Sequence, residues 1–255
     1  MKYYEDLIDF ECFTFEMVAQ LTGNTNTAEK AVQRLLKQGL IERVKRNLYV
    51  TINLVDYEPT ASKYQIGSQV TQTAVISHHA ALEYYGYTNQ VYHTITVSSK
   101  TRFQSFEFHG ITYERTSHLS DMGTVLTKDH VRIMDIERTM VDCLYAPNLA
   151  GGIEEIIRCF RLIPFVNEEK LLTYIKLFPN KAFYQRIGFI LEMFQVSLRL
   201  SSEIFTYLES QISKKNVSYL DSSNKNNCSL QKRWQLLVPE DIATTLTKGV
   251  KEHDL

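Results

Sequence analysis

Basic, amide and hydroxyl side chains cluster near the amino terminus in a pattern suited to binding nucleic acid. The chain of 255 residues has a net charge of −1, yet residues 24–50 hold six cations and two anions. Cations bind phosphate oxygens, while amide and guanidinium groups also read base edges. The candidate contacts are Thr25, Asn26, Thr27, Lys30, Gln33, Arg34, Lys37, Arg43, Lys45 and Arg46. Such a local patch indicates docking through one face and argues against general coating of a nucleic acid.

Two predicted helices would position most of these side chains. Apolar residues between Phe15 and Leu21 share one face of a short helix, and residues 22–24 supply a turn. We expect a second helix to begin at an Asn26 N-cap, with Glu29 completing a capping box, and to end at Gly39. The side chains expected to contact base edges or backbone from this helix are Thr25, Asn26, Thr27, Lys30, Gln33 and Arg34.

A basic-tipped hairpin is predicted next. Apolar runs at 40–41 and 48–50 would pair, with Asn47 in the left-handed turn conformation. Helix, turn, helix and hairpin together predict a winged helix–turn–helix over residues 1–58. The expected phosphate contacts are Lys37, Arg43, Lys45 and Arg46. The alternative is a helical pair that contacts protein, with its lysines exposed to solvent.

The rest of the chain predicts a second domain, and the whole is expected to be an α+β protein. Pro59, Gly67 and several polar residues predict a linker at 59–73. Residues 74–255 would form the second domain, with a two-residue hairpin at His109-Gly110. Its expected parts are a mixed α/β region (74–145), a helical region (146–212), a mobile loop (213–230) and a tail (231–255) with a strand at 234–239.

Clustered histidines raise the question of a metal site. Six of the seven histidines fall within 53 residues: His78, His79, His93, His109, His118 and His130. Their spacing is irregular and matches no helical ligand pattern, so we expect neither a metal nor another cofactor. The four cysteines form no CxxC pair, and we expect reduced, buried thiols.

An acidic group invites a catalytic interpretation. Asp135, Glu137 and Asp142 could be the metal ligands of a nuclease. On a helix, however, Arg138 and Asp142 stand four residues apart and would form an ion pair, so a structural brace is favoured and the protein is expected not to be an enzyme. Gly188, in a later helix, is expected to admit close helix packing.

The sequence predicts neither a secretory signal nor a membrane-spanning segment. The first sixteen residues carry five acids instead of a basic segment followed by an apolar one, which excludes a secretory signal. No apolar run is long enough for a membrane span. The sequence therefore predicts a cytoplasmic protein.

Five sequence blocks, in order, resemble the antitoxin of the AbiE abortive-infection system, an AbiEi-like transcriptional regulator. They are Gly-Leu-Ile-Glu-Arg-Val-Lys-Arg-Asn-Leu-Tyr-Val (39–50), Ile-Ser-His-His-Ala-Ala-Leu-Glu-Tyr-Tyr-Gly (76–86), Ile-Glu-Arg-Thr-Met-Val-Asp-Cys-Leu (136–144), Ala-Gly-Gly-Ile-Glu-Glu (150–155) and Gln-Arg-Ile-Gly-Phe-Ile-Leu-Glu (185–192). The resemblance covers roughly residues 10 to 195. In it, Arg43, Lys45 and Arg46 match the family's basic wing, while Asn47 stands where many relatives have glycine.

The resemblance implies a type IV antitoxin of a bacterial phage-defence system. Such a protein would bind inverted repeats in its own promoter, as double-stranded DNA, and repress the operon. It would also counteract a neighbouring nucleotidyltransferase toxin, without an obligatory stable complex. We further expect the chain from about Thr73 onward to suffice for antitoxicity. The alternatives are a ligand-responsive winged-helix repressor without a toxin and, less favoured, the DNA-targeted nuclease.

Overall fold

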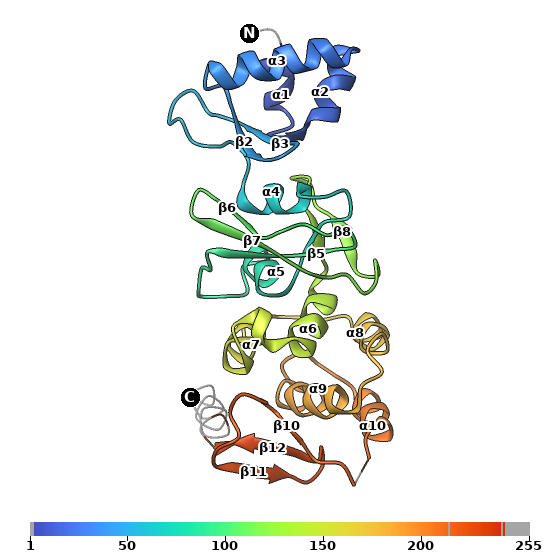
Figure 1. Cartoon of the computed structure of the whole chain (residues 1–255). Coiled ribbons are helices and arrows are strands. Elements are labelled where there is room, and N and C mark those ends of the chain that lie inside the picture. Colours follow the sequence, from blue (N-terminus) through green and yellow to red (C-terminus); the bar gives the residue numbers. More distant parts are fainter. Residues whose placement is uncertain (1–2, 214, 241, 243–255) are drawn as a thin grey trace. The chain divides into compact units, whose positions relative to one another are not determined.

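The computed structural model describes residues 3–213, 215–240 and 242 (Figure 1). Helices and mixed sheets give an α+β fold, as the sequence predicted. The chain divides into two compact units. Unit 1 comprises Met1–Ala80 and Tyr92–Met134, and unit 2 comprises Ala81–Val91 and Asp135–Leu255. Helix α5, His78–Tyr84, spans the first sequence boundary between them.

Unit 1 begins with three helices on a small antiparallel sheet (Figure 1). Its elements are α1 (Tyr4–Ile8), β1 (Cys12–Thr14), α2 (Phe15–Thr22), α3 (Thr25–Lys37), β2 (Ile41–Lys45) and β3 (Leu48–Thr51), with strand order β1-β3-β2. The buried residues that join the helices to the sheet include Phe13, Val18, Leu35 and Tyr49. The predicted order of helix, turn, helix and hairpin is therefore present.

The N-cap of α3 is Asn24, so the prediction of Asn26 was wrong. Gly23 ends α2 in the left-handed conformation, and the chain is already extended at Asn24. The Asn24 side chain then accepts hydrogen bonds from the backbone N–H groups of Asn26 and Thr27. Asparagine at either position could cap a helix, and the early turn at Gly23 selects the first.

A six-stranded mixed sheet forms the remainder of unit 1. Its order is β6 (Phe106–Phe108), β7 (Ile111–Ser117), β5 (Thr94–Ser99), β4 (Val75–Ile76), β9 (Arg132–Met134) and β8 (Thr124–Leu126). The β5–β7 and β4–β9 pairs are parallel and the others antiparallel. The two-residue hairpin at His109-Gly110 is confirmed, with both residues at positive φ.

Residues 59–73 are not the predicted linker. They contain α4 (Lys63–Gln69), which begins with a capping box between Ser62 and Gln65. A Cβ atom at Gly67 would lie 2.7 Å from Ile76 Cδ1 and 3.0 Å from Ile95 Cγ2. The glycine that looked like a linker residue thus lets α4 pack closely on the sheet.

Unit 2 is mainly helical. It holds α6 (Ile136–Tyr145), a 3-10 helix η1 (Pro147–Ala150), α7 (Ile153–Phe160), α8 (Glu168–Ile175), α9 (Lys181–Met193) and α10 (Ser202–Gln211). A sheet of order β10 (Ser218–Tyr219), β12 (Leu236–Pro239) and β11 (Cys228–Gln231) packs against α9 (Figure 1). One large apolar core joins these elements.

The segment expected to be a mobile loop, 213–230, contains β10 and the start of β11. Because this segment is polar, its two strands were not predicted. Both of them pair with β12, which lies in the predicted tail. A strand predicted at 234–239 is confirmed as Leu236–Pro239. Residues 214, 241 and 243–255 of the predicted loop and tail lie outside the described residues. Cys12, Cys143 and Cys159 are buried free thiols, and Cys228 is a half-buried one.

Gly188 faces an aromatic ring in the turn between β11 and β12, and not another helix. The indole of Trp234, 1% exposed, covers the position that a side chain at Gly188 would occupy. The Trp234 Nε1–H donates to Glu192 one helical turn further along α9, at 2.5 Å, and fixes the ring there. The glycine therefore docks the sheet of unit 2 on α9.

Substitution Gly188→Ala is expected to lower the free energy of unfolding by about 2–3 kcal/mol, since the added methyl overlaps a buried, hydrogen-bonded indole. Urea unfolding would measure this change. The matched control is Ala182→Gly, a half-buried helical position in α9, for which only about 1 kcal/mol of helix propensity is lost. A Gly188→Ala variant as stable as the parent would show that Trp234 does not pack as described.

Candidate nucleic-acid interface

Helix α3 separates an apolar face from a polar one. Ala28, Ala31, Val32 and Leu35 are buried, and they fix the helix on the core of unit 1. The polar face carries side chains at helical spacing, of which Lys30, Arg34 and Lys37 are cations. Every predicted contact on this helix is exposed: Thr25, Asn26, Thr27, Lys30, Gln33, Arg34 and Lys37. The structure thus gathers them on one accessible helical surface.

The β2–β3 hairpin turns through Arg46 and Asn47. Asn47 has a φ of 66°, which confirms the predicted left-handed conformation. Its Oδ1 accepts the backbone N–H of Phe15 at 3.1 Å, and its Nδ2 donates to the Glu16 carboxylate at 2.8 and 3.0 Å. The hydrogen bond from Asn47 lowers the pKa of Glu16. A polar side chain therefore ties the hairpin tip to the first turn of α2.

Asn47→Gly keeps the backbone conformation and removes these hydrogen bonds. We expect the pKa of Glu16 to rise toward its ordinary value and the protein to lose about 1 kcal/mol of stability at neutral pH. Because the Glu16 pKa is lowered on folding, its contribution exists above the unfolded pKa and disappears as pH falls through the folded one. NMR titration of Glu16 and urea unfolding at neutral and acid pH would measure both effects. A stability loss of the same size in acid would contradict the role given to Glu16.

Lys45 is engaged within unit 1. Its Nζ donates to the Val70 carbonyl oxygen at 3.2 Å and lies 5.2 and 5.4 Å from the ring centroids of Phe103 and Phe106. Burial lowers the pKa of this half-buried ammonium. A register shift in β2 between Arg43 and Lys45 accompanies this placement. Of the hairpin cations predicted to contact phosphate, Arg43 and Arg46 are the exposed ones.

A second set of contacts braces the hairpin. His109, in the β6–β7 turn, lies 2.9 Å from Glu42 Oε2 through Nε2 and 3.7 Å from Glu58 Oε2 through Nδ1. Glu42 belongs to β2, so the hairpin is held both by α2 and by the six-stranded sheet. The contacts of Asn47 with α2 and of His109 with Glu42 join residues far apart in the chain. Local sequence patterns therefore could not predict them.

The acidic residues considered for a nuclease have structural partners. Asp135 caps α6, Glu137 accepts the backbone N–H of Asn167 at 2.7 Å, and Asp142 receives Arg138 Nε at 2.9 Å. The predicted Arg138–Asp142 ion pair is thereby confirmed. Within the described residues these three carboxylates do not bring their oxygens together as a metal-ligand group. The arrangement is that of a brace around α6.

Comparison with known proteins bears on the fold. The sequence matches no family model and no curated protein. Its structure is similar to that of the RV2827C protein from Mycobacterium tuberculosis, with a TM-score of 0.62 and 12% identity over 94% of this chain and 89% of the other. At that identity the likeness concerns the α+β architecture alone.

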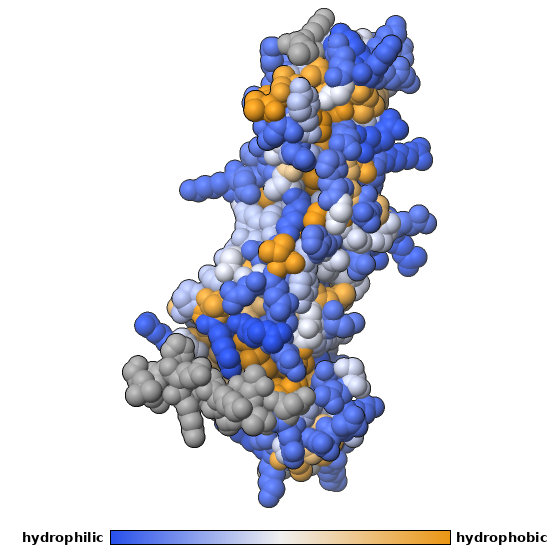
Figure 2. Space-filling model, turned by 90° about the vertical axis from the view of Figure 1, so that its left-hand side faces the viewer, coloured by the Kyte–Doolittle hydropathy of each residue, from blue (hydrophilic) through white to orange (hydrophobic). Residues whose placement is uncertain are grey.

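A helix that crosses a membrane needs about 20 mainly apolar residues. In the described part of the chain no helix combines the length and apolar character needed to cross a membrane. On the face shown in Figure 2, hydrophobic residues form separate groups among hydrophilic ones.

Proposed function

We propose that the protein is a double-stranded DNA-binding repressor that also acts as the antitoxin of a type IV toxin–antitoxin system. The observation that carries the DNA-binding part is the exposed polar face of α3 together with the arginines of a braced hairpin. A helix with one exposed polar face can enter a major groove, and a basic hairpin beside it can contact flanking phosphates. In this proposal α2, α3 and the β2–β3 hairpin would act as a winged helix–turn–helix.

In the proposed complex α3 supplies the base-reading side chains. Asn26, Gln33 and Arg34 have the amide and guanidinium groups that pair with base edges, while Lys30 and Lys37 neutralise phosphates. Arg43 and Arg46 would contact the backbone from the hairpin. Lys45 would act indirectly, by holding the hairpin on Phe103 and Phe106. Inverted repeats in the promoter would receive two copies of the chain.

The antitoxin part is supported by the order of sequence blocks shared with the AbiE family. Two of these blocks, 136–144 and 185–192, lie in α6 and α9 and contribute largely buried residues. They therefore support a core of unit 2 similar to that of the AbiE family. The surface that neutralises the toxin would be formed by exposed residues around this core. The proposal places the protein in the bacterial cytoplasm, without an enzymatic activity of its own.

Co-expression with the neighbouring gene tests the antitoxin part. The full chain should rescue growth if the neighbour is toxic, and a full-length variant with α3 and the hairpin disabled should rescue equally well. A fragment starting at Thr73 is unsuitable, since it lacks α4 and uncovers Ile76 and Ile95. A harmless neighbour would contradict the antitoxin proposal and favour the ligand-responsive repressor.

A further inference from the structure

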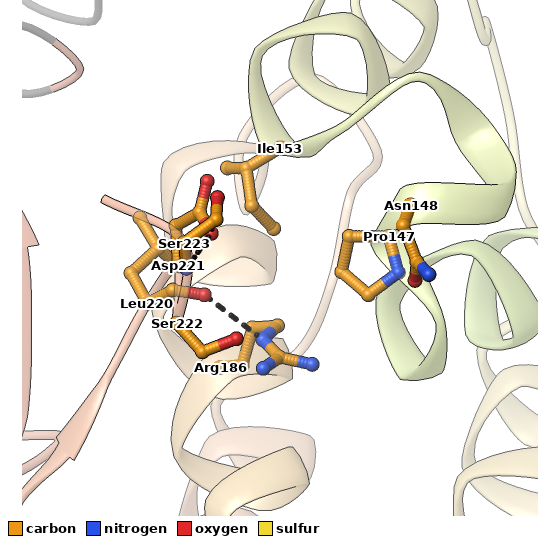
Figure 3. Close-up of a pocket in the computed structure, with 8 residues that line it drawn as sticks. All are labelled: Pro147, Asn148, Ile153, Arg186, Leu220, Asp221, Ser222 and Ser223. Carbon is orange, nitrogen blue, oxygen red and sulfur yellow. Dashed lines mark hydrogen bonds between the residues drawn. The ribbon is translucent and has the colours of Figure 1, made fainter. Parts of the chain in front are cut away.

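Unit 2 contains a small pocket, lined by both polar and apolar residues, to which the proposed DNA-binding and antitoxin functions assign no role. Its volume is about 270 Å³. Its walls come from η1, the first residue of α7, the middle of α9 and the loop after β10 (Figure 3). The lining residues are Pro147, Asn148, Ile153, Arg186, Leu220, Asp221, Ser222 and Ser223.

Arg186 provides the positive side of the pocket. Its Nε donates to the Leu220 carbonyl oxygen at 3.1 Å and its Nη1 to the Leu144 carbonyl oxygen at 3.0 Å. Its Nη2 has no hydrogen-bond partner among the residues that the structure describes. Burial lowers the pKa of the guanidinium, which indicates a site where water solvates the charge poorly. Two backbone carbonyl oxygens thus hold the Arg186 side chain in place, and its Nη2 can still donate to a ligand.

Asp221 provides the negative side. Its Oδ1 accepts the backbone N–H of Ser223 at 2.8 Å and the Ser223 hydroxyl at 2.6 Å. Figure 3 shows Asp221 and Arg186 bordering the same space, with no ion pair between them in the described part of the chain. Opposite charges at this range would attract each other. The charge of Asp221 opposes the lowering of the Arg186 pKa by burial, while the hydrogen bonds of each group go to other partners.

We propose that this pocket binds a small zwitterion of the α-amino-acid class. The ligand carboxylate would accept from the terminal nitrogens of Arg186, and its ammonium would donate to Asp221. Pro147, Ile153 and Leu220 offer apolar surface to a short aliphatic side chain. A simple anion would be repelled by Asp221 and a simple cation by Arg186, so a ligand with both charges fits best.

Calorimetric titration of the full chain with L-alanine, L-valine and L-leucine tests this inference. The N-acetyl and the amide derivative of each amino acid remove one charge at a time. At least one free amino acid should bind, and both of its derivatives should bind about tenfold or more weakly. Failure of all three to bind would overturn the proposal, as would derivatives that bind as tightly as the parent.

Two variants assign the charges. Asp221→Asn keeps an acceptor for Ser223 and removes the negative charge, so it should weaken amino-acid binding about tenfold. The anionic N-acetyl derivative loses a repulsion and should bind at least as tightly as before. Arg186→Lys loses the planar donor pair and should weaken both ligands about tenfold. Glu169→Gln, an exposed position on α8, is the matched control and should change neither. An Asp221→Asn variant that weakens both ligands equally would contradict the role given to Asp221.

Discussion

Promoter DNA should bind about a thousandfold more weakly to the triple variant Lys30→Ala/Arg34→Ala/Arg46→Ala than to the parent protein. Each of these side chains is exposed, two on the polar face of α3 and one at the hairpin tip. Loss of one base or phosphate contact costs about 1–3 kcal/mol, so three losses of about 1.4 kcal/mol give this factor. Gel shift or fluorescence anisotropy over a range of salt concentrations would measure it.

The salt dependence separates the proposed interface from a general effect of charge. Lys30 and Arg46 are the proposed phosphate contacts of this set, so the slope of log affinity against log salt should fall by about 1.8. The control variant Lys181→Ala/Arg199→Ala/Lys232→Ala removes the same number of exposed cations from unit 2. It should bind nearly as the parent does. Equal losses in the two variants would mean that α3 and the hairpin do not form the interface.

The amino-terminal elements could be predicted because their signals are local. The stripe of Ala28, Val32 and Leu35 repeats at helical spacing, and Asn47 tolerates the positive φ that a tight turn needs. Such signals involve residues within a few positions of one another. They predicted which side of α3 would face solvent. Most residues of the candidate interface lie on that side.

Features formed by distant residues could not be predicted in the same way. Lys45 lies over Phe103 and Phe106, which are far along the chain, and its burial follows from the packing of the β2–β3 hairpin on the six-stranded sheet. Gly67 looked like a linker residue because its close approach to Ile76 is a tertiary contact. The Ser62–Gln65 capping box is a local signal for the start of α4. The polar composition of the segment nevertheless led to the prediction of a linker.

The pocket of unit 2 illustrates the same limit for a candidate site. Arg186 lies on a helix and Asp221 in a polar loop, and neither residue type is unusual in its own segment. The loop that follows β10 lies against α9, and its Leu220 carbonyl oxygen accepts a hydrogen bond from Arg186. This contact joins residues that are far apart in the sequence. Periodicity describes one element at a time, whereas this pocket is formed by η1, α7, α9 and the loop after β10.

Substitution Arg138→Met is expected to lower the free energy of unfolding by about 3–5 kcal/mol at neutral pH, because it leaves the buried Asp142 carboxylate without its cation. Burial raises the pKa of Asp142 from its ordinary 3.8 to about 6, the Arg138 charge opposes this rise, and the nearby Asp135 adds to it. Without Arg138 the pKa of Asp142 should rise further.

The sign of the pH dependence follows from this shift. A carboxyl whose pKa is raised on folding contributes stability below its unfolded value of 3.8, and that contribution is lost as pH rises through the folded value of about 6. In Arg138→Met the loss should extend to higher pH. The two proteins should therefore differ least in acid and most at neutral pH, as measured by urea unfolding. A destabilisation independent of pH would mean that Arg138 acts through packing alone.

A second substitution distinguishes the brace from a metal-binding acid. Adding Asp142→Asn to Arg138→Met removes the uncompensated charge, so the double variant should be more stable than the single one at neutral pH. The exposed pair Lys100–Asp121 is the control, for which Lys100→Met should leave the free energy of unfolding nearly unchanged. If Asp142 instead served a nuclease, Asp142→Asn alone would abolish Mg²⁺-dependent cleavage of DNA. A stabilising second substitution, in a chain that cleaves no DNA, would assign Asp142 to the architecture of α6.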